Sequence, residues 1–389
     1  MKKFLLSILM GCSLLEAAAQ TAFTVNHGPY LQEVTQDGAT IVFTTSRKAF
    51  SWVELKQHDA PEAEAVKHFN SKDGLKEAWN TFSLVRVEHL KPGTSYDYRI
   101  ISKEMRSFQP YKVVYGDSIA TKWHTFSTID PQKRGGSFFI TSDMHFDAAK
   151  LEKLLHAADY RTCDAFFYAG DMTSYIDKFE IPFTSFIDTS VKLFASSVPF
   201  EVVRGNHETR GNLARTYSSY FPKKNGTIYG SCLLGDVMVV MLDSGEDKAE
   251  NHWVYAGLND YDAYRTEQAE WLKELMNTKE YKKAKYRIVI SHFPMVMSQQ
   301  WKDEKEWVGW EDAIRKFLPV LNKGNVDLLV SGHTHRYFFH EQNVDGNNFP
   351  VLEQGESSAV RLELHGGKVQ FQVIGVDGKI LMEKTISKK

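Results

Sequence analysis

The sequence predicts a two-domain chain of mixed α+β and α/β class, in which an all-β module precedes an α/β domain. Short runs rich in β-branched and aromatic residues, separated by turns, fill residues 22–128. A polar, turn-rich stretch at 130–136 then marks a boundary. From residue 137 onward, short apolar runs alternate with helical patterns, as in α/β domains. A chain of 389 residues is long for one domain and suits two.

The predicted β module contains runs of strand type at 40–45, 51–55, 82–87, 96–101 and 123–128. Its most specific piece is the turn at 90–95, which leads into a strand that opens with Tyr96. Sandwich domains place a corner tyrosine there, and its hydroxyl hydrogen-bonds to a nearby backbone group. The module thus resembles a fibronectin type III domain, and we interpret it as a packing partner instead of a binding module.

The predicted α/β domain has strands at 137–141, 165–169, 201–203, 237–242, 287–290 and 328–330. Helical spacing at 148–158, 266–276 and 310–321 separates several of these strands. Such alternation indicates a sheet that is buried on both faces. The tail, 351–386, returns to β hairpins with turns at Gly366-Gly367 and Asp377-Gly378.

The first twenty residues read as a secretory signal peptide. Lys2 and Lys3 precede an apolar run at 4–15, and the alanines at 17–19 suit cleavage near residue 19 or 20. We therefore expect an exported protein, periplasmic or secreted. The alternative is a lipoprotein signal that uses Cys12, and only this lipid anchor would attach the chain to a membrane.

Composition excludes several classes of protein. A formal net charge of -2 gives no signal for nucleic-acid binding. Beyond the N-terminal segment only Cys163 and Cys232 are present, which excludes a disulfide scaffold. The content of 42% hydrophobic and 25% charged residues is that of an ordinary globular protein, and nothing in it indicates an oligomeric state.

Polar residues of the kind that bind metals follow five of the predicted strands. They lie in the segments Asp143-Met144-His145, Gly170-Asp171, Gly205-Asn206-His207-Glu208, Ser291-His292 and Gly332-His333-Thr334-His335. In open α/β sheets, ligands bind beyond the carboxyl ends of the strands, so these side chains are expected to converge. Imidazole and carboxylate together suit a pair of divalent transition metals. A spacing of two in extended chain predicts that Asp143 and His145 point the same way.

This ordered set of motifs resembles the calcineurin-like metallophosphoesterase superfamily over about residues 137–345. With the fibronectin-like module in front, the whole chain resembles the purple acid phosphatase branch. The resemblance implies an N-terminal β-sandwich followed by a four-layer α/β/β/α domain. After the predicted signal peptide at 1–20, we therefore expect a fibronectin type III-like domain at 22–128 and a metallophosphoesterase domain at 137–389.

The resemblance also implies residue roles. One metal would be held by Asp143, His145 and His335, a second by Asn206, His292 and His333, and Asp171 would bridge both. His207 would face the substrate and protonate the leaving group, and Glu208 is expected either to orient His207 or to form a surface salt bridge.

The implied function is hydrolysis of a phosphomonoester by a hydroxide that bridges two metals. Two adjacent metals lower the pKa of a shared water and neutralise phosphate oxygens. The same site also suits a phosphodiesterase or a pyrophosphatase. A catalytically inactive binding protein is a further alternative, which the complete set of seven candidate ligands disfavours.

The sequence departs from the purple acid phosphatase branch at the iron-binding tyrosine. That tyrosine stands three residues after the Asp of the Gly-Asp motif, where this chain has Ser174, and Tyr175 comes one residue later. His145 replaces a glycine of the branch. A neutral imidazole suits divalent ions, so we expect Mn, Zn or Fe(II) and no ferric-tyrosinate centre.

Two aromatic-rich segments, 251–264 and 295–310, lie between predicted elements. Trp253, Tyr255 and Trp301 are candidates for the wall of a substrate pocket. The alternative is that these aromatics pack over the edge of the sheet.

Overall fold

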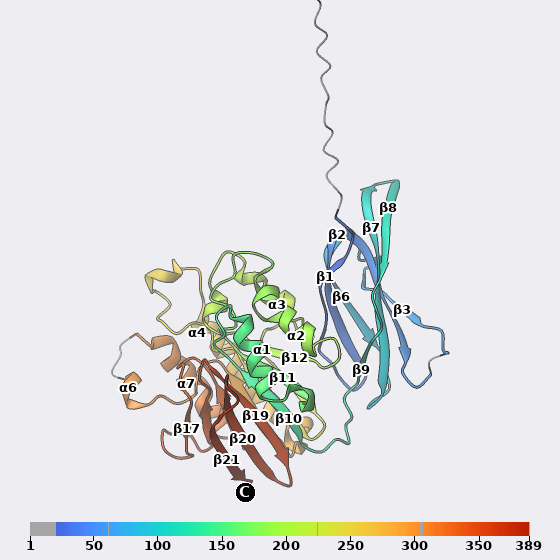
Figure 1. Ribbon diagram of the computed structural model, residues 1–389. Helices are drawn as coiled ribbons and strands as arrows, with labels where there is room; N and C mark the ends of the chain where they lie inside the picture. Colours follow the sequence, from blue (N-terminus) through green and yellow to red (C-terminus); the bar gives the residue numbers. More distant parts are fainter. Residues whose placement is uncertain (1–20, 61, 224, 303–305, 389) are drawn as a thin grey trace, which may run out of the picture.

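The computed structural model describes residues 21–60, 62–223, 225–302 and 306–388 (Figure 1). The predicted signal peptide and Cys12 lie outside these residues. Within them, none of the helices combines the length and the apolar character needed to cross a membrane.

The N-terminal domain is β-rich. It contains β1 (Val25–Gln32), β2 (Gly38–Gln57), β3 (Val66–His68), β4 (Ser71–Lys72), β5 (Leu75–Lys76), β6 (Asn80–Glu88), β7 (Ser95–Gln109), β8 (Lys112–Ala120) and β9 (His124–Ser127). The first half of β2 pairs with β1 and β6, and its second half pairs with β3 and β7. The expectation of separate strands at 40–45 and 51–55 is therefore wrong. They form one strand, in which a bulge-like irregularity between Thr44 and Ala49 changes its partner.

The corner tyrosine is confirmed, because the Lys91 backbone N–H donates a hydrogen bond of 2.9 Å to the Tyr96 hydroxyl. The long hairpin of β7 and β8 is not foreseen from the sequence. Nearly all of β8 is exposed, so it lacks the alternation of buried and exposed residues that identifies a strand.

The C-terminal domain contains two six-stranded sheets. The first has the order β12-β11-β10-β19-β20-β21, from β10 (Gly136–Thr141), β11 (Ala165–Ala169), β12 (Phe200–Val203), β19 (Ser358–His365), β20 (Lys368–Gly375) and β21 (Ile380–Ser387). The second has the order β13-β14-β15-β16-β18-β17, from β13 (Gly230–Leu234), β14 (Val237–Leu242), β15 (Tyr286–Ser291), β16 (Leu328–Ser331), β17 (Phe338–His340) and β18 (Val351–Glu353).

Helices cover the outer faces of both sheets. The helices are α1 (Ala148–Ala157), α2 (Asp188–Leu193), α3 (Tyr217–Tyr220), α4 (Tyr261–Asn277), α5 (Lys279–Lys283), α6 (Gln299–Lys302) and α7 (Val308–Leu321). One buried cluster joins the inner faces of the two sheets, through residues such as Ile140 and Ile288. Separate clusters join α1 to the first sheet and both α4 and α7 to the second. The predicted four-layer α/β/β/α arrangement is thus confirmed.

The β-rich domain packs against the first sheet and its helices (Figure 1). The Tyr30 hydroxyl donates to the Tyr220 carbonyl at 2.8 Å, and the Tyr98 hydroxyl donates to the Ser196 carbonyl at 2.8 Å. Both tyrosines are buried, so these hydrogen bonds fix the relative position of the domains.

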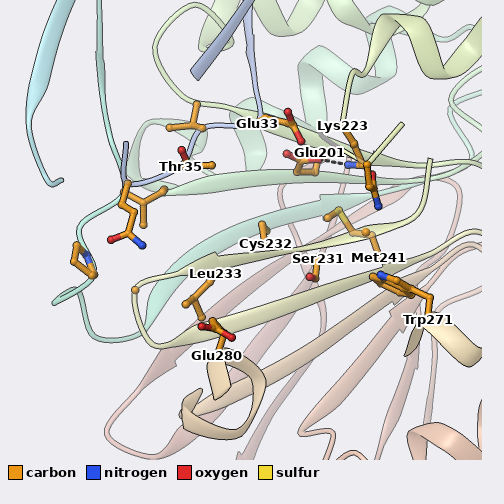
Figure 2. A pocket seen from close by; sticks show the side chains of 17 residues that line it. Glu33, Thr35, Glu201, Lys223, Ser231, Cys232, Leu233, Met241, Trp271 and Glu280 are labelled. Carbon is orange, nitrogen blue, oxygen red and sulfur yellow. Dashed lines mark hydrogen bonds and ion pairs between the residues drawn. The ribbon is translucent and has the colours of Figure 1, made fainter. Parts of the chain in front are cut away.

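A cavity of about 610 Å³ lies where residues 33–36 of the β-rich domain approach β13 (Figure 2). Inside it, the Lys223 ammonium is neutralised by the Glu201 carboxylate at 2.5 Å. None of the candidate metal ligands lines this cavity, so it is separate from the site predicted from the sequence.

Candidate metal centre

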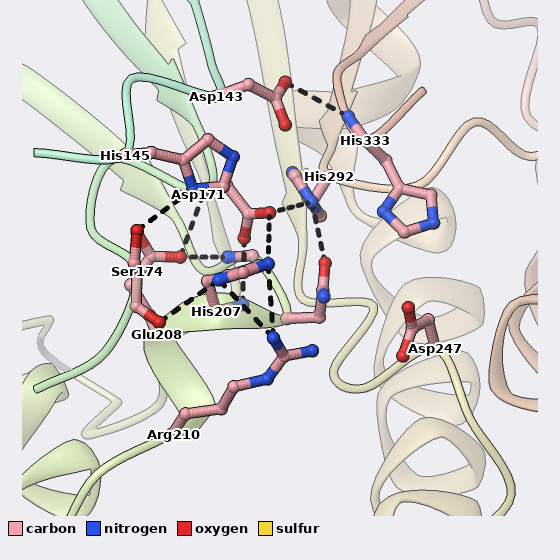
Figure 3. Close-up of polar contacts among 12 residues, drawn as sticks. Asp143, His145, Asp171, Ser174, His207, Glu208, Arg210, Asp247, His292 and His333 are labelled. Atoms are coloured by element: carbon pink, nitrogen blue, oxygen red, sulfur yellow. Dashed lines mark hydrogen bonds and ion pairs between the residues drawn. The ribbon is translucent and has the colours of Figure 1, made fainter. Parts of the chain in front are cut away.

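The candidate ligands converge beyond the carboxyl ends of β10, β11, β12, β15 and β16, as predicted (Figure 3). Three overlapping groups have ligand atoms within 4.8 Å of one another: Asp143, His145 and His335; His145, Asp171 and His207; Asp143, Asp171 and His292. Asn206 joins them, because its Oδ1 lies 3.0 Å from His292 Nε2. The ring of His333 lies 5.2 Å from that of His292.

The loops that carry these ligands are not extended. Left-handed φ values occur at Asp143 (56°), His145 (47°), Asp171 (53°), His333 (75°) and His335 (58°). The prediction that the candidate ligands converge is confirmed. The expectation that Asp143 and His145 lie in extended chain is wrong, because both residues have left-handed φ values. Each such residue costs about 1–3 kcal/mol and persists only where the surrounding fold enforces it, as commonly happens at functional sites.

Glycines allow the loops to approach so closely. A Cβ atom at Gly170 would lie 2.6 Å from His292 Nδ1, and one at Gly332 would lie 2.5 Å from Asp143 Oδ2. Any side chain at these positions would push a candidate ligand away from the centre.

His292 is oriented by a backbone hydrogen bond. Its Nδ1 lies 2.9 Å from the Ala169 carbonyl and donates to it, which leaves Nε2 facing Asn206 Oδ1 and, at 3.2 Å, Asp171 Oδ2. Burial alone would lower the pKa of His292, but the Asp171 carboxylate raises that pKa to about 10. A proton on His292 therefore competes with a metal ion for the same place.

The side chains fit a metal ion on chemical grounds. Asp143 Oδ1 is buried and has no hydrogen-bond partner among the described residues. His145 Nε2 and His335 Nε2 lie only 3.4 Å apart, and His335 Nε2 is 3.4 Å from Asp143 Oδ1. A buried carboxylate oxygen without a hydrogen bond is costly, and a cation between these three groups would satisfy it.

A profile of calcineurin-like phosphoesterases matches residues 136–337. The chain belongs to this family. It is therefore a metal-dependent phosphoesterase, and the alternative of a catalytically inactive binding protein is set aside.

One solved structure supports the two-domain fold. A purple acid phosphatase from yellow lupin (Lupinus luteus) seeds is 17% identical, with a TM-score of 0.68 over 93% of this chain and 74% of that one. A phosphopantetheinyl hydrolase from Mycobacterium tuberculosis is 15% identical, with a TM-score of 0.39 over 56% of this chain and 89% of its own. No curated protein matches by sequence.

His207 of the phosphoesterase lies at the edge of the centre (Figure 3). Its backbone N–H donates to Asp171 Oδ1 at 2.9 Å, and its Nδ1 lies 3.1 Å from the Ser174 carbonyl. If Nδ1 donates to that carbonyl, Nε2 accepts from the Arg210 guanidinium at 3.2 Å and holds a proton only in the charged form of the ring, which burial disfavours by lowering the pKa of His207. Its position suits the predicted role of proton donor, which stays a prediction.

The alternative of a surface salt bridge at Glu208 is wrong, because the side chain is buried, and none of the described hydrogen bonds joins its carboxylate to the His207 imidazole. The carboxylate accepts backbone N–H groups of Asp171 (2.9 Å), Thr173 (2.9 Å) and Gly205 (2.8 Å). Burial and the charge of Asp171 raise the pKa of Glu208 to about 7. Because the chain turns tightly at 207–209, Glu208 points inward and ties together the loops that carry Asp171 and Asn206.

Ser174 contacts a candidate ligand, whereas Tyr175 packs on Phe146. Ser174 Oγ lies 3.4 Å from His145 Nδ1. Tyr175 is 45% exposed, and its ring packs edge-on against Phe146 at 5.1 Å. The phenol thus lies against a rim residue, one position beyond the residue that faces the centre.

The three aromatic candidates for the pocket wall differ in what their side chains contact. Trp301 packs on Trp307, whose ring lies edge-on to His333 at 5.5 Å, so Trp301 lies one ring away from a candidate ligand. The Tyr255 hydroxyl donates to Glu246 at 2.7 Å beside the centre. Trp253 is 83% exposed, and its ring neighbours His252. Its described ring contact is therefore with its own segment and not with the candidate ligands.

Sequence reasoning missed Arg210. Its Nη1 lies 3.2 Å from His207 Nε2, and its Nε lies 3.4 Å from Glu246 Oε1 (Figure 3). Guanidinium groups bind phosphate through two parallel hydrogen bonds. An arginine three residues after His207 could therefore have been predicted from the sequence as a phosphate-binding residue. Its partner Glu246 is distant in sequence, and only the fold brings it near.

A buried network supports the loop between His333 and His335. The Thr334 hydroxyl donates to Glu353 Oε2 at 2.6 Å, and His340 lies between Glu353 (2.5 Å) and Asp345 (3.0 Å). We expect Glu353→Gln to weaken metal binding by about 10–100-fold, the usual effect of losing an outer partner of a metal site. Titration against a chelating dye measures this change.

The matched control is Glu341→Gln, which alters an exposed carboxylate in the same stretch of chain and should leave the affinity unchanged. Equal metal affinity in wild type and Glu353→Gln would contradict the role of the network.

Proposed function

We propose that this phosphoesterase is an exported hydrolase of phosphomonoesters that uses two divalent metal ions. The observation that carries the proposal is the position of Asp171, which lies within ligand reach of two groups of side chains at once (Figure 3). One group contains His145 and the other contains His292, and the resemblance assigns these two histidines to different metal ions. A carboxylate shared in this way suits a pair of metal ions and not a single one.

The candidate ligands divide between two ions. Asp143, His145 and His335 would hold one, Asn206, His292 and His333 the other, and Asp171 both. When bound, such ions lower the pKa of a coordinated water and neutralise phosphate oxygens. In its charged form His207 would give a proton from Nε2 to the leaving oxygen, and the Arg210 guanidinium, which lies 3.2 Å from Nε2, would bind a phosphate oxygen.

The test of the reaction is a substrate panel. The purified enzyme should hydrolyse an aryl phosphate, lose this activity after chelation and dialysis, and regain it with Mn²⁺ or Zn²⁺. The phosphodiesterase and pyrophosphatase alternatives use the same site, and a preference for bis-aryl phosphate or a pyrophosphate would favour them. Full turnover of the dialysed protein would contradict the metal requirement.

For the metals, we predict a colourless enzyme with two divalent ions. Tyr175 packs on Phe146, and Ser174 stands next to His145, so no phenolate is aimed at the centre by the described contacts. After loading with iron in air, the visible spectrum should lack an intense tyrosinate-to-iron band. A band that disappears in Tyr175→Phe but persists in the control Tyr337→Phe would overturn this prediction.

The proposal that the protein is exported depends on residues 1–20, which have the basic start, apolar run and alanines of a signal peptide. Cell fractionation should find the chain outside the cytoplasm. If Cys12→Ser releases a membrane-bound form, the lipoprotein alternative is right.

A further inference from the structure

The strands β7 and β8 end in a hairpin that extends beyond the rest of their sheet (Figure 1). β7 pairs with β2 as far as Glu104, and from Met105 to Gln109 its only partner among the described strands is β8. We call residues 105–115 the hairpin tip. A lone two-stranded ribbon is at best marginally stable in water, so contact with another surface would stabilise the tip.

The hairpin tip carries apolar side chains on both of its faces. Phe108 and Val113 are directly opposed and share one face, whereas Val114 lies opposite Ser107 on the other. All three apolar side chains are exposed, and Tyr111 at the turn is fully exposed. Exposed apolar groups gathered in one place mark a binding surface. Because these groups lie on both faces, their partner must surround the tip, which a fluid lipid layer can do and a flat protein surface cannot.

Cations accompany the apolar side chains of the tip. Lys112 stands next to the turn, and residues 105–116 contain no Asp or Glu. The Lys48 ammonium lies 4.8 Å from the centre of the Trp79 ring, which meets the Phe108 ring edge-on at 6.1 Å. Aromatic rings and lysines together are typical of the membrane interface, where rings enter the headgroup layer and lysines pair with anionic headgroups.

The start of the described chain lies at the base of the same hairpin. Arg47 donates hydrogen bonds both to the Thr21 carbonyl and to the Glu104 carboxylate, at the point where β7 leaves β2. In the lipoprotein alternative, residues 13–20 would connect a lipid on Cys12 to this base and span at most about 30 Å. The anchor and the hairpin tip would then meet the same membrane.

We propose that the hairpin tip of the β-rich domain inserts into the headgroup layer of an anionic lipid membrane. The rings and the apolar side chains supply the affinity, and Lys112 supplies a preference for anionic lipids. This contact does not depend on the reaction at the metal centre. It also goes beyond the expectation from the sequence, in which a lipid on Cys12 would be the only attachment to a membrane.

The test is sedimentation of the purified protein with vesicles of phosphatidylglycerol and phosphatidylcholine in equal parts. Wild type should bind these vesicles. The double variant Phe108→Ser, Tyr111→Ser should bind them at least about tenfold more weakly, because two rings are lost from the tip. The matched control is Val66→Ser, Leu75→Ser, which changes two exposed apolar residues of the same domain outside the tip. Residues 1–20 are treated identically in all of these proteins, so a difference reports on the hairpin.

The charge of the tip is tested separately by Lys112→Glu, which leaves the apolar side chains in place. It should weaken binding to the anionic vesicles by at least about fivefold, and it should leave the weaker binding to pure phosphatidylcholine unchanged. An equal effect on both kinds of vesicle would overturn the role of the anionic headgroups.

A polarity-sensitive dye attached to Tyr111→Cys reports whether the tip itself enters the lipid. Its emission should shift to the blue on anionic vesicles, and the same dye on Leu75→Cys should not shift. A blue shift that appears without vesicles and grows with protein concentration would overturn the proposal in favour of pairing between two copies of the chain. Equal sedimentation of wild type and Phe108→Ser, Tyr111→Ser would also overturn it, as would a wild type that stays in solution with the anionic vesicles.

Discussion

Asp171→Asn should abolish turnover and reduce the metal content of the enzyme at both positions. The carboxylate is buried and belongs to two of the three candidate ligand groups, one with His145 and one with His292. Its amide replacement is nearly the same size, but it removes the negative charge that would attract both ions. Loss of several kcal/mol of electrostatic stabilisation corresponds to a fall of at least about 1000-fold in kcat. Turnover of an aryl phosphate and elemental analysis measure the two effects.

Asp177→Asn is the matched control, because it changes an exposed carboxylate of the same loop. It should retain full activity and metal content. An Asp171→Asn enzyme that holds both metals at wild-type affinity would show that Asp171 does not bridge them.

His207→Ala has the second-largest expected effect. We expect it to retain both metals yet lose about 10²–10⁴-fold in turnover, the usual contribution of a positioned general acid. The loss should be largest for alkyl phosphates, whose leaving oxygen most needs a proton, and smallest for 4-nitrophenyl phosphate. Parallel measurement of metal content separates this role from that of a ligand.

The control for this variant is His156→Ala, on the exposed side of α1. Loss of metal from His207→Ala would make His207 a ligand, which its place beside His145 and Asp171 also permits. An equal loss for alkyl and aryl phosphates would rule out proton donation to the leaving group.

The sequence by itself determined the elements that carry the site. Each candidate ligand follows a short apolar run, and these runs form β10, β11, β12, β15 and β16 close to the predicted bounds. Local pattern suffices here, because buried strands in α/β sheets are marked by their apolar residues and their carboxyl ends lie at one edge. The family-type motifs therefore identified the phosphoesterase domain before any contact was known.

Only the tertiary structure decided where individual side chains point. From the sequence, Glu208 was expected to form a surface salt bridge or to orient His207. The turn at 207–209 instead buries its carboxylate against three backbone N–H groups. Likewise, the left-handed φ at Asp143 cannot be read from spacing, because the surrounding packing enforces it.

The surroundings of the centre also depend on contacts between distant segments. Arg210 is held by Glu246, which lies on another loop, and the unpaired amide of Asn259 belongs to the same cavity as Arg210. Sequence patterns report local structure and burial, whereas a cavity forms from segments brought together by the whole fold. For this reason the sequence predicted the metal centre, and the cavity lined by Arg210 appeared only in three dimensions.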